Sequence, residues 1–317
     1  RLLLQAFAPV MVLEALVAAQ TSVLRAHLKA NATLRLNLFM NGLHLVLALV
    51  LMPSMGLLGY AAALLCSRIC GVALGWRLWR DVLKLACRWH DLWRWNAPAM
   101  KGVLQVGVPS AAENILYRVC AMVSVAVAGG LGTAELATQA YAQQLAAITI
   151  LPGVAIGLSA EILVGHLIGQ GEFRRARRTV LKGLLWGLCA SVFTAGAVAL
   201  AAPWLLRGLT HDPQIITSGT LLLAWTVLLE PGRTFNIVVI NALRAAGDTR
   251  FPVAAGALSM ILVLGAGSWW LGASLGWGLV GIWLAYIADE WIRGLMMWWR
   301  WTSLQWLPHA RRAIRRG

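Results

Sequence analysis

The sequence predicts an all-α, polytopic helical membrane protein, and three observations support this fold class. First, 60% of the 317 residues are hydrophobic and 12% are charged, whereas soluble domains have roughly half apolar and a quarter charged residues. Second, long apolar stretches recur along the chain, and in lipid an α-helix is the structure in which a single segment forms all its backbone hydrogen bonds internally. Third, Lys and Arg gather in alternate connecting segments, which is typical of chains that cross a membrane repeatedly.

Nine stretches are apolar and long enough to span a bilayer, which takes about 20 helical residues. Several contain glycine or proline, which membrane helices tolerate because neighbouring groups satisfy the freed backbone. The predicted spans are 2–24, 36–53, 57–79, 104–128, 138–168, 180–203, 218–243, 252–271 and 278–299.

The basic residues predict the orientation of these spans. The segments 25–35, 77–101, 174–182, 244–250 and 300–316 carry most of the 27 Lys and Arg, whereas the loops between them hold Arg207. Because basic loops stay on the cytoplasmic side, we expect a cytoplasmic C-terminus and Arg1 outside. The net charge of +15 is then explained by contact with anionic membrane lipids. No element suited to reading nucleic acid is present, so we expect no nucleic-acid partner.

An internal repeat relates the first three spans to the last three. Leu24-Arg25-Ala26 and Leu243-Arg244-Ala245 each precede a loop and a span, with the two arginines 219 positions apart (244 − 25). The pieces 56–59 (GLLG) and 278–281 (GLVG) then open the next span in each copy. Transporters are often built from such repeats. Six spans follow residue 102 but three precede it, so we expect a chain truncated by three helices at its N-terminus.

The repeat and the charge pattern together predict four regions. Residues 1–80 are expected to form the last three helices of an N-terminal lobe, and 102–302 a six-helix C-terminal lobe. Between them, 81–101 interleaves Trp with Arg, Lys and His, which indicates an amphipathic cytoplasmic linker with its tryptophans at headgroup level. Residues 303–317 are expected to be a basic cytoplasmic tail.

Four pieces of the second half, in this order and spacing, resemble one known family. They are 107–113 (GVPSAAE), 132–139 (GTAELATQ), 151–171 with its repeated glycines, and 242–252 (ALRAAGDTRFP). Together they resemble the C-terminal lobe of a multidrug and toxic compound extrusion (MATE) transporter. The resemblance covers nearly the whole chain, as helices four to twelve of a twelve-helix, two-lobed bundle.

The resemblance implies a function. It implies a secondary active antiporter in a bacterial inner membrane that exports cationic or amphipathic drugs in exchange for sodium ions or protons. Alternating access between two six-helix lobes would drive the exchange. No cofactor is implied beyond the coupling ion, and we expect a monomer that is not an enzyme.

Glu113 and Tyr117 are the first candidate site residues. Glu113 lies one turn after Pro109 inside a predicted span, and a carboxylate there can bind a proton or pair with a cation. In one sodium-coupled branch of the family, an acidic residue stands at the place of Tyr117 and an aspartate at that of Arg233. These departures put that branch's ion site in doubt here.

The stretch from 229 to 252 carries charged and polar groups into a predicted span. Glu230 and Arg233 are three residues apart and can pair on one face of a helix. Asn236 lies on the same face. Pro231-Gly232 is expected to weaken the helix and to free backbone carbonyls, as at transporter binding sites. We therefore expect a moving or binding element here.

Further charges lie inside other spans. Asp289 and Glu290 precede Arg293 by four and three residues, which favours paired packing on one face. Glu14 stands where the repeat places Arg233 in the other half, so a pair between these two is predicted. The intramembrane residues Arg68 and Arg118 need acidic or carbonyl partners.

Other classes of function remain as alternatives. A flippase for lipid-linked oligosaccharides, from a related superfamily, would be expected to show more charge along a central cavity. A membrane-embedded enzyme would need a cluster of His, Asp or Glu at a membrane face, and the external loops hold few of these. The sequence shows no nucleophile elbow, phosphate-binding loop or metal-ligand spacing, so we expect no metal site.

Overall fold

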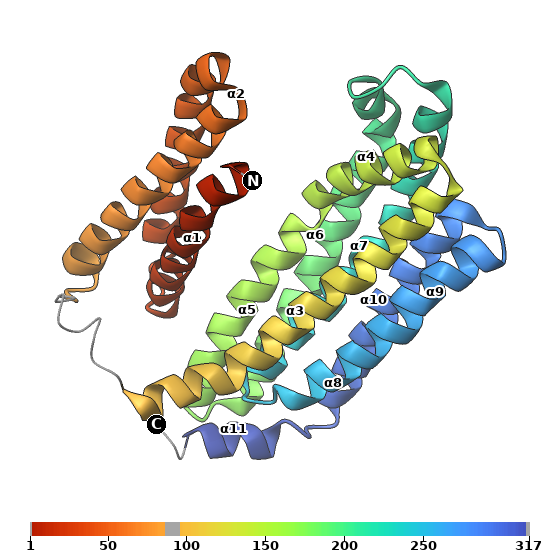
Figure 1. Cartoon of the computed structure of the whole chain (residues 1–317). Helices are drawn as coiled ribbons and strands as arrows, with labels where there is room; N and C mark the ends of the chain where they lie inside the picture. Colours follow the sequence, from red (N-terminus) through yellow and green to blue (C-terminus); the bar gives the residue numbers. More distant parts are fainter. Residues whose placement is uncertain (1, 86–95, 315–317) are drawn as a thin grey trace. The chain divides into compact units, whose positions relative to one another are not determined.

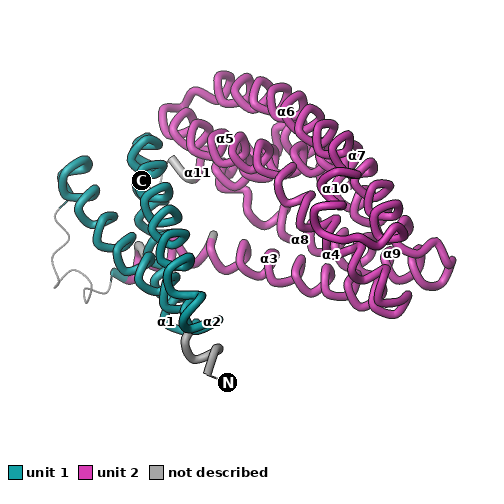
Figure 2. The backbone as a smooth tube through the Cα atoms, turned by 90° about the horizontal axis from the view of Figure 1, so that it is seen from above, with its two compact units in different colours: residues 1–96 teal, residues 97–317 magenta. Residues whose placement is uncertain are grey.

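The computed structural model describes residues 2–85 and 96–314, and within these ranges it is helical with no strand. The chain divides into two compact units, Arg1–Asn96 and Ala97–Gly317 (Figure 2). Residues 86–95 of the amphipathic linker predicted at 81–101 lie outside the described residues, while its first two residues end α2 and residues 97–101 begin α3.

The hydrogen-bonding pattern of unit 1 defines two helices, but the second changes direction, so the unit contains three helical segments. Helix α1 covers Leu2–Ala26, and α2 covers Ala30–Val82. Helix α2 folds back on itself at Gly56, whose φ of 56° is not helical (Figure 1). This turn separates the predicted spans 36–53 and 57–79, which the fold brings side by side.

Unit 2 is a bundle of long helices that run back and forth (Figure 1). Its elements are α3 (Ala97–Leu131), α4 (Thr133–Thr149), α5 (Leu151–Gly169), α6 (Phe173–Arg207), α7 (Pro213–Ala245), α8 (Arg250–Ser259), α9 (Ala266–Trp269), α10 (Gly278–Thr302) and α11 (Leu307–Ile314). Two π-helical segments, Met260–Gly265 and Trp270–Ser274, flank α9. The basic connections α5–α6, α7–α8 and α10–α11 lie at one end of the unit, as the charge pattern predicts.

Seven helical segments of the described residues are long and apolar enough to cross a membrane. They overlap eight of the nine predicted spans, because α2 contains two. The ninth, 278–299, is α10, which has the length of a span but carries Asp289, Glu290 and Arg293. The predicted span 138–168 is divided at Ile150 into α4 and α5, with Pro152 in the first turn of α5. Proline fits there since the first amides of a helix have no partner within it.

Helix α7 is the central helix of unit 2. It packs against α4, α5, α6 and α10. The main hydrophobic core lies around its C-terminal half, at Val238, Val239 and Leu243. The predicted basic tail joins this core: Trp306 is buried and stacks on Trp301, with ring centroids 4.4 Å apart. The tail therefore continues into a short helix, α11, that is docked on the unit.

The internal repeat is visible in the backbone where α1 and α7 end. Residues 27–29 donate amide hydrogen bonds of 2.9–3.1 Å back to residues 23–25, and residues 246–248 make the same three bonds, of 2.9–3.0 Å, to residues 242–244. The middle residue of each turn has a positive φ, 58° at Leu28 and 80° at Gly247. A left-handed residue after the last turn is a common way to end a helix, because its amide and the next one cap free carbonyls.

The glycine pairs of the repeat also have equivalent roles. Gly56 and Gly278 both have positive φ, 56° and 58°, a conformation that glycine adopts without steric cost. Three residues later in each copy, a glycine lies so close to the preceding helix that a Cβ would overlap the backbone of Leu51 or Leu271. The sequence motif thus marks a tight helical hairpin in each repeat, and the predicted repeat is confirmed.

Candidate functional site

Helices α7 and α10 bring five charged side chains together inside unit 2. On α7, Arg233 Nη1 lies 2.7 Å from Glu230 Oε1, as the spacing of three residues predicts. Across the helix contact, Arg233 Nε lies 3.4 Å from Glu290 Oε1. On α10, Arg293 Nη2 lies 2.7 Å from Asp289 Oδ2 and 3.0 Å from Glu290 Oε1. We call these five residues the charged cluster.

Polar neighbours complete the charged cluster. Asn236 Nδ2 donates to Glu290 Oε2 at 2.9 Å, and Ser259 Oγ donates to Asp289 Oδ1 at 2.6 Å. The three carboxyl side chains are nearly inaccessible: Glu230 is 0%, Asp289 1% and Glu290 3% exposed. Buried charges are stable only when paired and hydrogen-bonded. The cluster therefore connects α7, α8 and α10 at the depth of the membrane.

Helix α7 continues through Pro231 and Gly232 as one helix. The weakening predicted at Pro231-Gly232 therefore does not break the helix, and the glycine has another role. A Cβ at Gly232 would lie 2.7 Å from the indole of Trp291, so glycine lets α10 approach α7 closely. The Trp291 indole also donates a hydrogen bond of 3.0 Å to the Leu228 carbonyl. One carbonyl of α7 thus accepts a bond from α10, at the turn before the proline.

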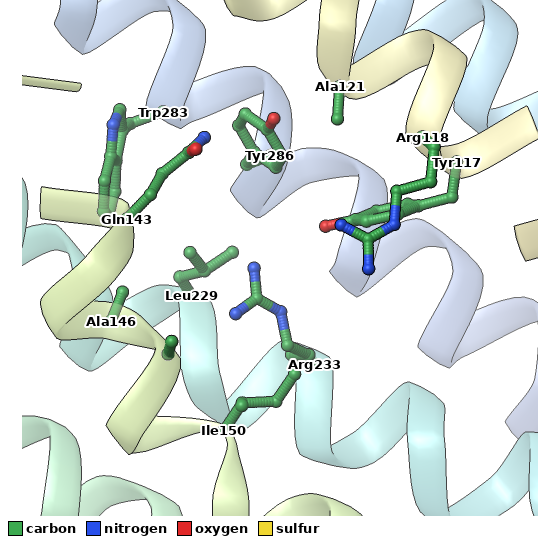
Figure 3. A pocket seen from close by; sticks show the side chains of 11 residues that line it. Tyr117, Arg118, Ala121, Gln143, Ala146, Ile150, Leu229, Arg233, Trp283 and Tyr286 are labelled. Atoms are coloured by element: carbon green, nitrogen blue, oxygen red, sulfur yellow. The ribbon is translucent and has the colours of Figure 1, made fainter. Parts of the chain in front are cut away.

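A cavity of about 340 Å³ lies beside the charged cluster (Figure 3). Side chains from α3, α4, α7 and α10 line it, together with Ile150. Two of them are arginines, Arg118 from α3 and Arg233 from α7, and both guanidinium groups point into the space between the helices. The other lining residues are Tyr117, Ala121, Gln143, Ala146, Ala147, Ile150, Leu229, Trp283 and Tyr286.

The cavity and the charged cluster share one residue and touch at a second. Arg233 lines the cavity while it pairs with Glu230 and Glu290. The ring of Tyr117, another lining residue, lies under the guanidinium of Arg293, with 5.9 Å from Arg293 Cζ to the ring centroid. A ligand in the cavity would therefore contact Arg233, which belongs to the cluster, and Tyr117, which contacts it.

Glu113 lies apart from the charged cluster. Its Oε2 is 2.6 Å from Nη2 of Arg244, the loop arginine at the end of α7. Asp248 pairs nearby with Arg300 at 2.8 Å, and the Arg300 guanidinium lies 4.8 Å from the Phe251 ring centroid. These contacts join α3, α7, α8 and α10 at the basic end of unit 2, where Glu113 pairs with a cation.

Glu14 pairs with Arg68 inside unit 1, and Arg233 pairs with Glu230 and Glu290 inside unit 2. The predicted Glu14–Arg233 pair would join the two units and stays a prediction, while each residue has a partner in its own unit. The Glu14–Arg68 and Arg233–Glu290 pairs occupy equivalent positions of the internal repeat. Glu14 and Arg233 are 219 positions apart (233 − 14), and Arg68 and Glu290 are 222 apart (290 − 68), the two offsets of the repeat. Both units therefore hold an ion pair at equivalent positions, with the charges exchanged.

Some residues of the site were not predicted. Gln143, Trp283 and Tyr286 line the cavity but lie in apolar stretches without a distinguishing motif. Trp283 Nε1 donates to Gln139 Oε1 at 2.8 Å, which fixes its ring between α4 and α10. The sequence signal for Arg118 was its charge inside a span. Such a charge points to a cavity or a partner, but does not tell which.

Comparison with known proteins now identifies the family. The family model MatE matches residues 109–268, half of the chain. The chain belongs to the MATE family. The transporter YisQ of Bacillus subtilis is 31% identical to this MATE protein over 93% of the chain. The NorM protein of Bradyrhizobium diazoefficiens, a probable multidrug resistance protein, is 27% identical over 62% of the chain. The chain spans 66% of the length of YisQ and 43% of the length of this NorM protein.

Solved MATE structures have the same fold. A eukaryotic MATE transporter superposes with a TM-score of 0.88 over 98% of this chain and 70% of its own, at 15% identity. The Vibrio cholerae MATE transporter VcmN gives a TM-score of 0.85 over 95% of this chain and 68% of its own, at 18% identity. At such low identity these structures establish the fold alone. This MATE protein is therefore an integral membrane protein with the fold that the sequence predicted.

Proposed function

We propose that the chain belongs to an ion-coupled antiporter that exports amphipathic small molecules in exchange for sodium ions or protons. Membership of the MATE family supports this proposal. So does the relationship to probable multidrug resistance proteins such as NorM.

The observation that carries the proposal is the charge balance of the buried cluster. Three carboxyl groups, of Glu230, Asp289 and Glu290, face two guanidinium groups, of Arg233 and Arg293. With every group ionised, the cluster has one negative charge in excess. A buried excess charge is costly, and one proton or one sodium ion would neutralise it. Asn236 Oδ1 is buried beside the cluster without a hydrogen-bond partner, so this oxygen could also bind the sodium ion.

Arg233 supplies a physical route from ion binding to ligand release. A cation or proton at Glu230 or Glu290 competes with Arg233 for the same carboxylate. The guanidinium that it displaces can move into the cavity, which Arg233 already lines. It then occupies space that a ligand would use. Ion and ligand would thus exclude each other, as exchange requires.

The basic connections of both units support a bacterial inner-membrane location with the C-terminus in the cytoplasm. In this orientation the Glu113–Arg244 pair lies at the cytoplasmic end of unit 2. We propose that the protein acts as a monomer.

The test is transport by the full-length protein in vesicles. Efflux of ethidium, a cation, and of carboxyfluorescein, an anion, is measured under an imposed sodium or pH gradient. We expect one gradient to drive efflux of at least one probe. Glu230→Gln should abolish this efflux, whereas Glu172→Gln, which changes an exposed ion pair with Arg175, should not. Silence of folded protein with both probes and both gradients would contradict the proposal and favour the lipid-linked oligosaccharide flippase.

A further inference from the structure

We propose that the cavity between α3, α4, α7 and α10 binds an acidic group of the transported molecule, a carboxylate, sulfonate or phosphate, through Arg118. This inference rests on the proposed transport function and names the class of its substrate. It departs from the cationic drugs that the family resemblance implies.

The charged side chains in the wall of the cavity are arginines. Of its eleven lining residues, Arg118 and Arg233 carry a charge and none is acidic. Glu230, Asp289 and Glu290 are bound to arginines behind the wall, and Arg233 is one of these arginines. Arg118 is therefore the charge in the wall that is left for a ligand, and an acidic group can pair with it whereas a cationic group cannot.

Arg118 differs from the other intramembrane arginines. Arg68, Arg233, Arg244 and Arg293 each pair with a carboxylate. Among the residues that the structure describes, Arg118 has no such partner, and its side chain faces the cavity. A guanidinium group at the middle of a membrane helix is costly unless it is paired or solvated. Arg118 is exposed, so an acidic ligand can reach it, and the planar guanidinium can bind this ligand with two parallel hydrogen bonds.

The rest of the wall suits an aromatic acid. Tyr117, Trp283 and Tyr286 offer aromatic surface, and Gln143 offers an amide. A volume of about 340 Å³ lies at the lower end of small-molecule sites, which span roughly 300–1,000 Å³. A ligand with one or two rings and one acidic group matches this space.

Binding at Arg118 is compatible with the charged cluster. Arg118 lies on α3 and takes no part in the ion pairs of α7 and α10. An acidic group there takes no partner from Glu230 or Glu290. The acidic group and the coupling ion thus bind to different residues. Movement of Arg233 into the cavity would couple the two binding events.

The test is equilibrium binding to the full-length protein in detergent, without any gradient. The two probes are 4-nitrobenzoate and 4-nitrobenzylammonium, which have the same ring and opposite charge. Both quench tryptophan fluorescence, and Trp283 lies in the wall. We expect the wild-type protein to bind 4-nitrobenzoate at least about tenfold more tightly than the cation. Arg118→Gln should remove this preference, and Arg118→Glu should reverse it.

Arg207→Gln is the matched control, because Arg207 is exposed at the end of α6 and does not line the cavity. It should leave both affinities unchanged. Unchanged 4-nitrobenzoate binding by a folded Arg118→Gln protein, or no saturable binding of this probe to the wild type, would overturn the inference. Either result would leave gradient-driven efflux untouched. Conversely, selective binding without efflux would contradict the proposed transport and not the acidic-group site.

Discussion

At the scale of single residues, Glu290 is the side chain on which the charged cluster depends most. Its two oxygens contact Asn236 at 2.9 Å, Arg293 at 3.0 Å and Arg233 at 3.4 Å. It thus serves both guanidinium groups of the cluster and connects α7 with α10. Its removal would leave two buried cations with one carboxylate each.

We predict that Glu290→Ala lowers the free energy of unfolding by about 1–3 kcal/mol, because buried donors of Asn236, Arg233 and Arg293 lose an acceptor while each arginine keeps one carboxylate. The measurement is unfolding of the detergent-solubilised protein with increasing SDS, followed by circular dichroism. Glu172→Ala is the matched control: it breaks a 2.6 Å pair with Arg175 that is exposed, and such pairs contribute about 0–1 kcal/mol. Equal losses in the two variants would show that the cluster contributes no more than a surface pair.

The sequence predicts contacts within a helix better than contacts between helices. The pairs Glu230–Arg233 and Asp289–Arg293 follow from spacing along one helix, and both are confirmed. The link from Arg233 to Glu290 could not be predicted, because it depends on which faces of α7 and α10 meet. The same limit applies to the pair between Glu14 and Arg68: the repeat identifies equivalent positions in the two units, but it does not tell which residues are in contact.

At the scale of elements, the two hairpins of the repeat have the same local backbone conformations although their sequences differ. A residue with positive φ ends the first helix, at Leu28 or Gly247, and a glycine with positive φ turns the chain, at Gly56 or Gly278. The turn glycines were visible in the sequence as a shared motif. The equivalence of Leu28 and Gly247 was not, since leucine rarely adopts this conformation.

The exchanged ion pair gives a prediction for these elements. We expect Glu14→Arg and Arg68→Glu to destabilise the protein singly, because each brings two like charges together. The double variant should recover much of the loss, since unit 2 already holds its pair in the opposite sense. A double-mutant cycle on unfolding should give a coupling free energy of about 1–3 kcal/mol.

The control for this cycle is the neighbouring pair Arg80–Asp81, whose side chains are 71% and 64% exposed. Exchanging these two residues should give almost no coupling, because solvent screens exposed charges. If the Glu14–Arg68 cycle shows no coupling either, the pair contributes nothing to the contact between α1 and α2.

At the scale of the whole molecule, the distribution of charge predicts how unit 2 crosses the membrane. The basic run 174–178 lies in the first turns of α6, next to the α5–α6 connection, whereas Arg207 is the last residue of α6, next to the α6–α7 connection. Helix α6 is 35 residues long, at about 1.5 Å per residue enough to separate these two connections by a bilayer.

We predict opposite accessibility for these two connections. A cysteine at Gln170, in a variant without the five native cysteines, should react with a membrane-impermeant maleimide in inverted vesicles and not in intact cells. A cysteine at His211 should behave in the opposite way. Labelling of both positions from the same side would contradict the crossing of the membrane by α6, and the reversed pattern would contradict the cytoplasmic C-terminus that we propose.

Most of the architecture was predictable because membrane helices leave strong signals. Length, apolarity and the side of the basic residues predicted the spans, and the family motifs predicted the fold. The cavity was not predictable in the same way. Its walls come from four helices, and residues such as Gln143 and Trp283 become neighbours only after α4 and α10 have packed. The division at Ile150 was also missed, because the residues on both sides of it are apolar.

The exchanged ion pair carries information about ancestry. If the two hairpins descend from one duplicated segment, one copy has since inverted the sense of its pair, from Glu14–Arg68 to Arg233–Glu290 or the reverse. No single substitution accomplishes this, and every one-step intermediate has two like charges or a lone charge within the bundle. Such an inversion therefore passes through at least one sequence in which the pair is absent. Both hairpins retain an attraction between two helices, although the helix that carries the positive charge differs between them.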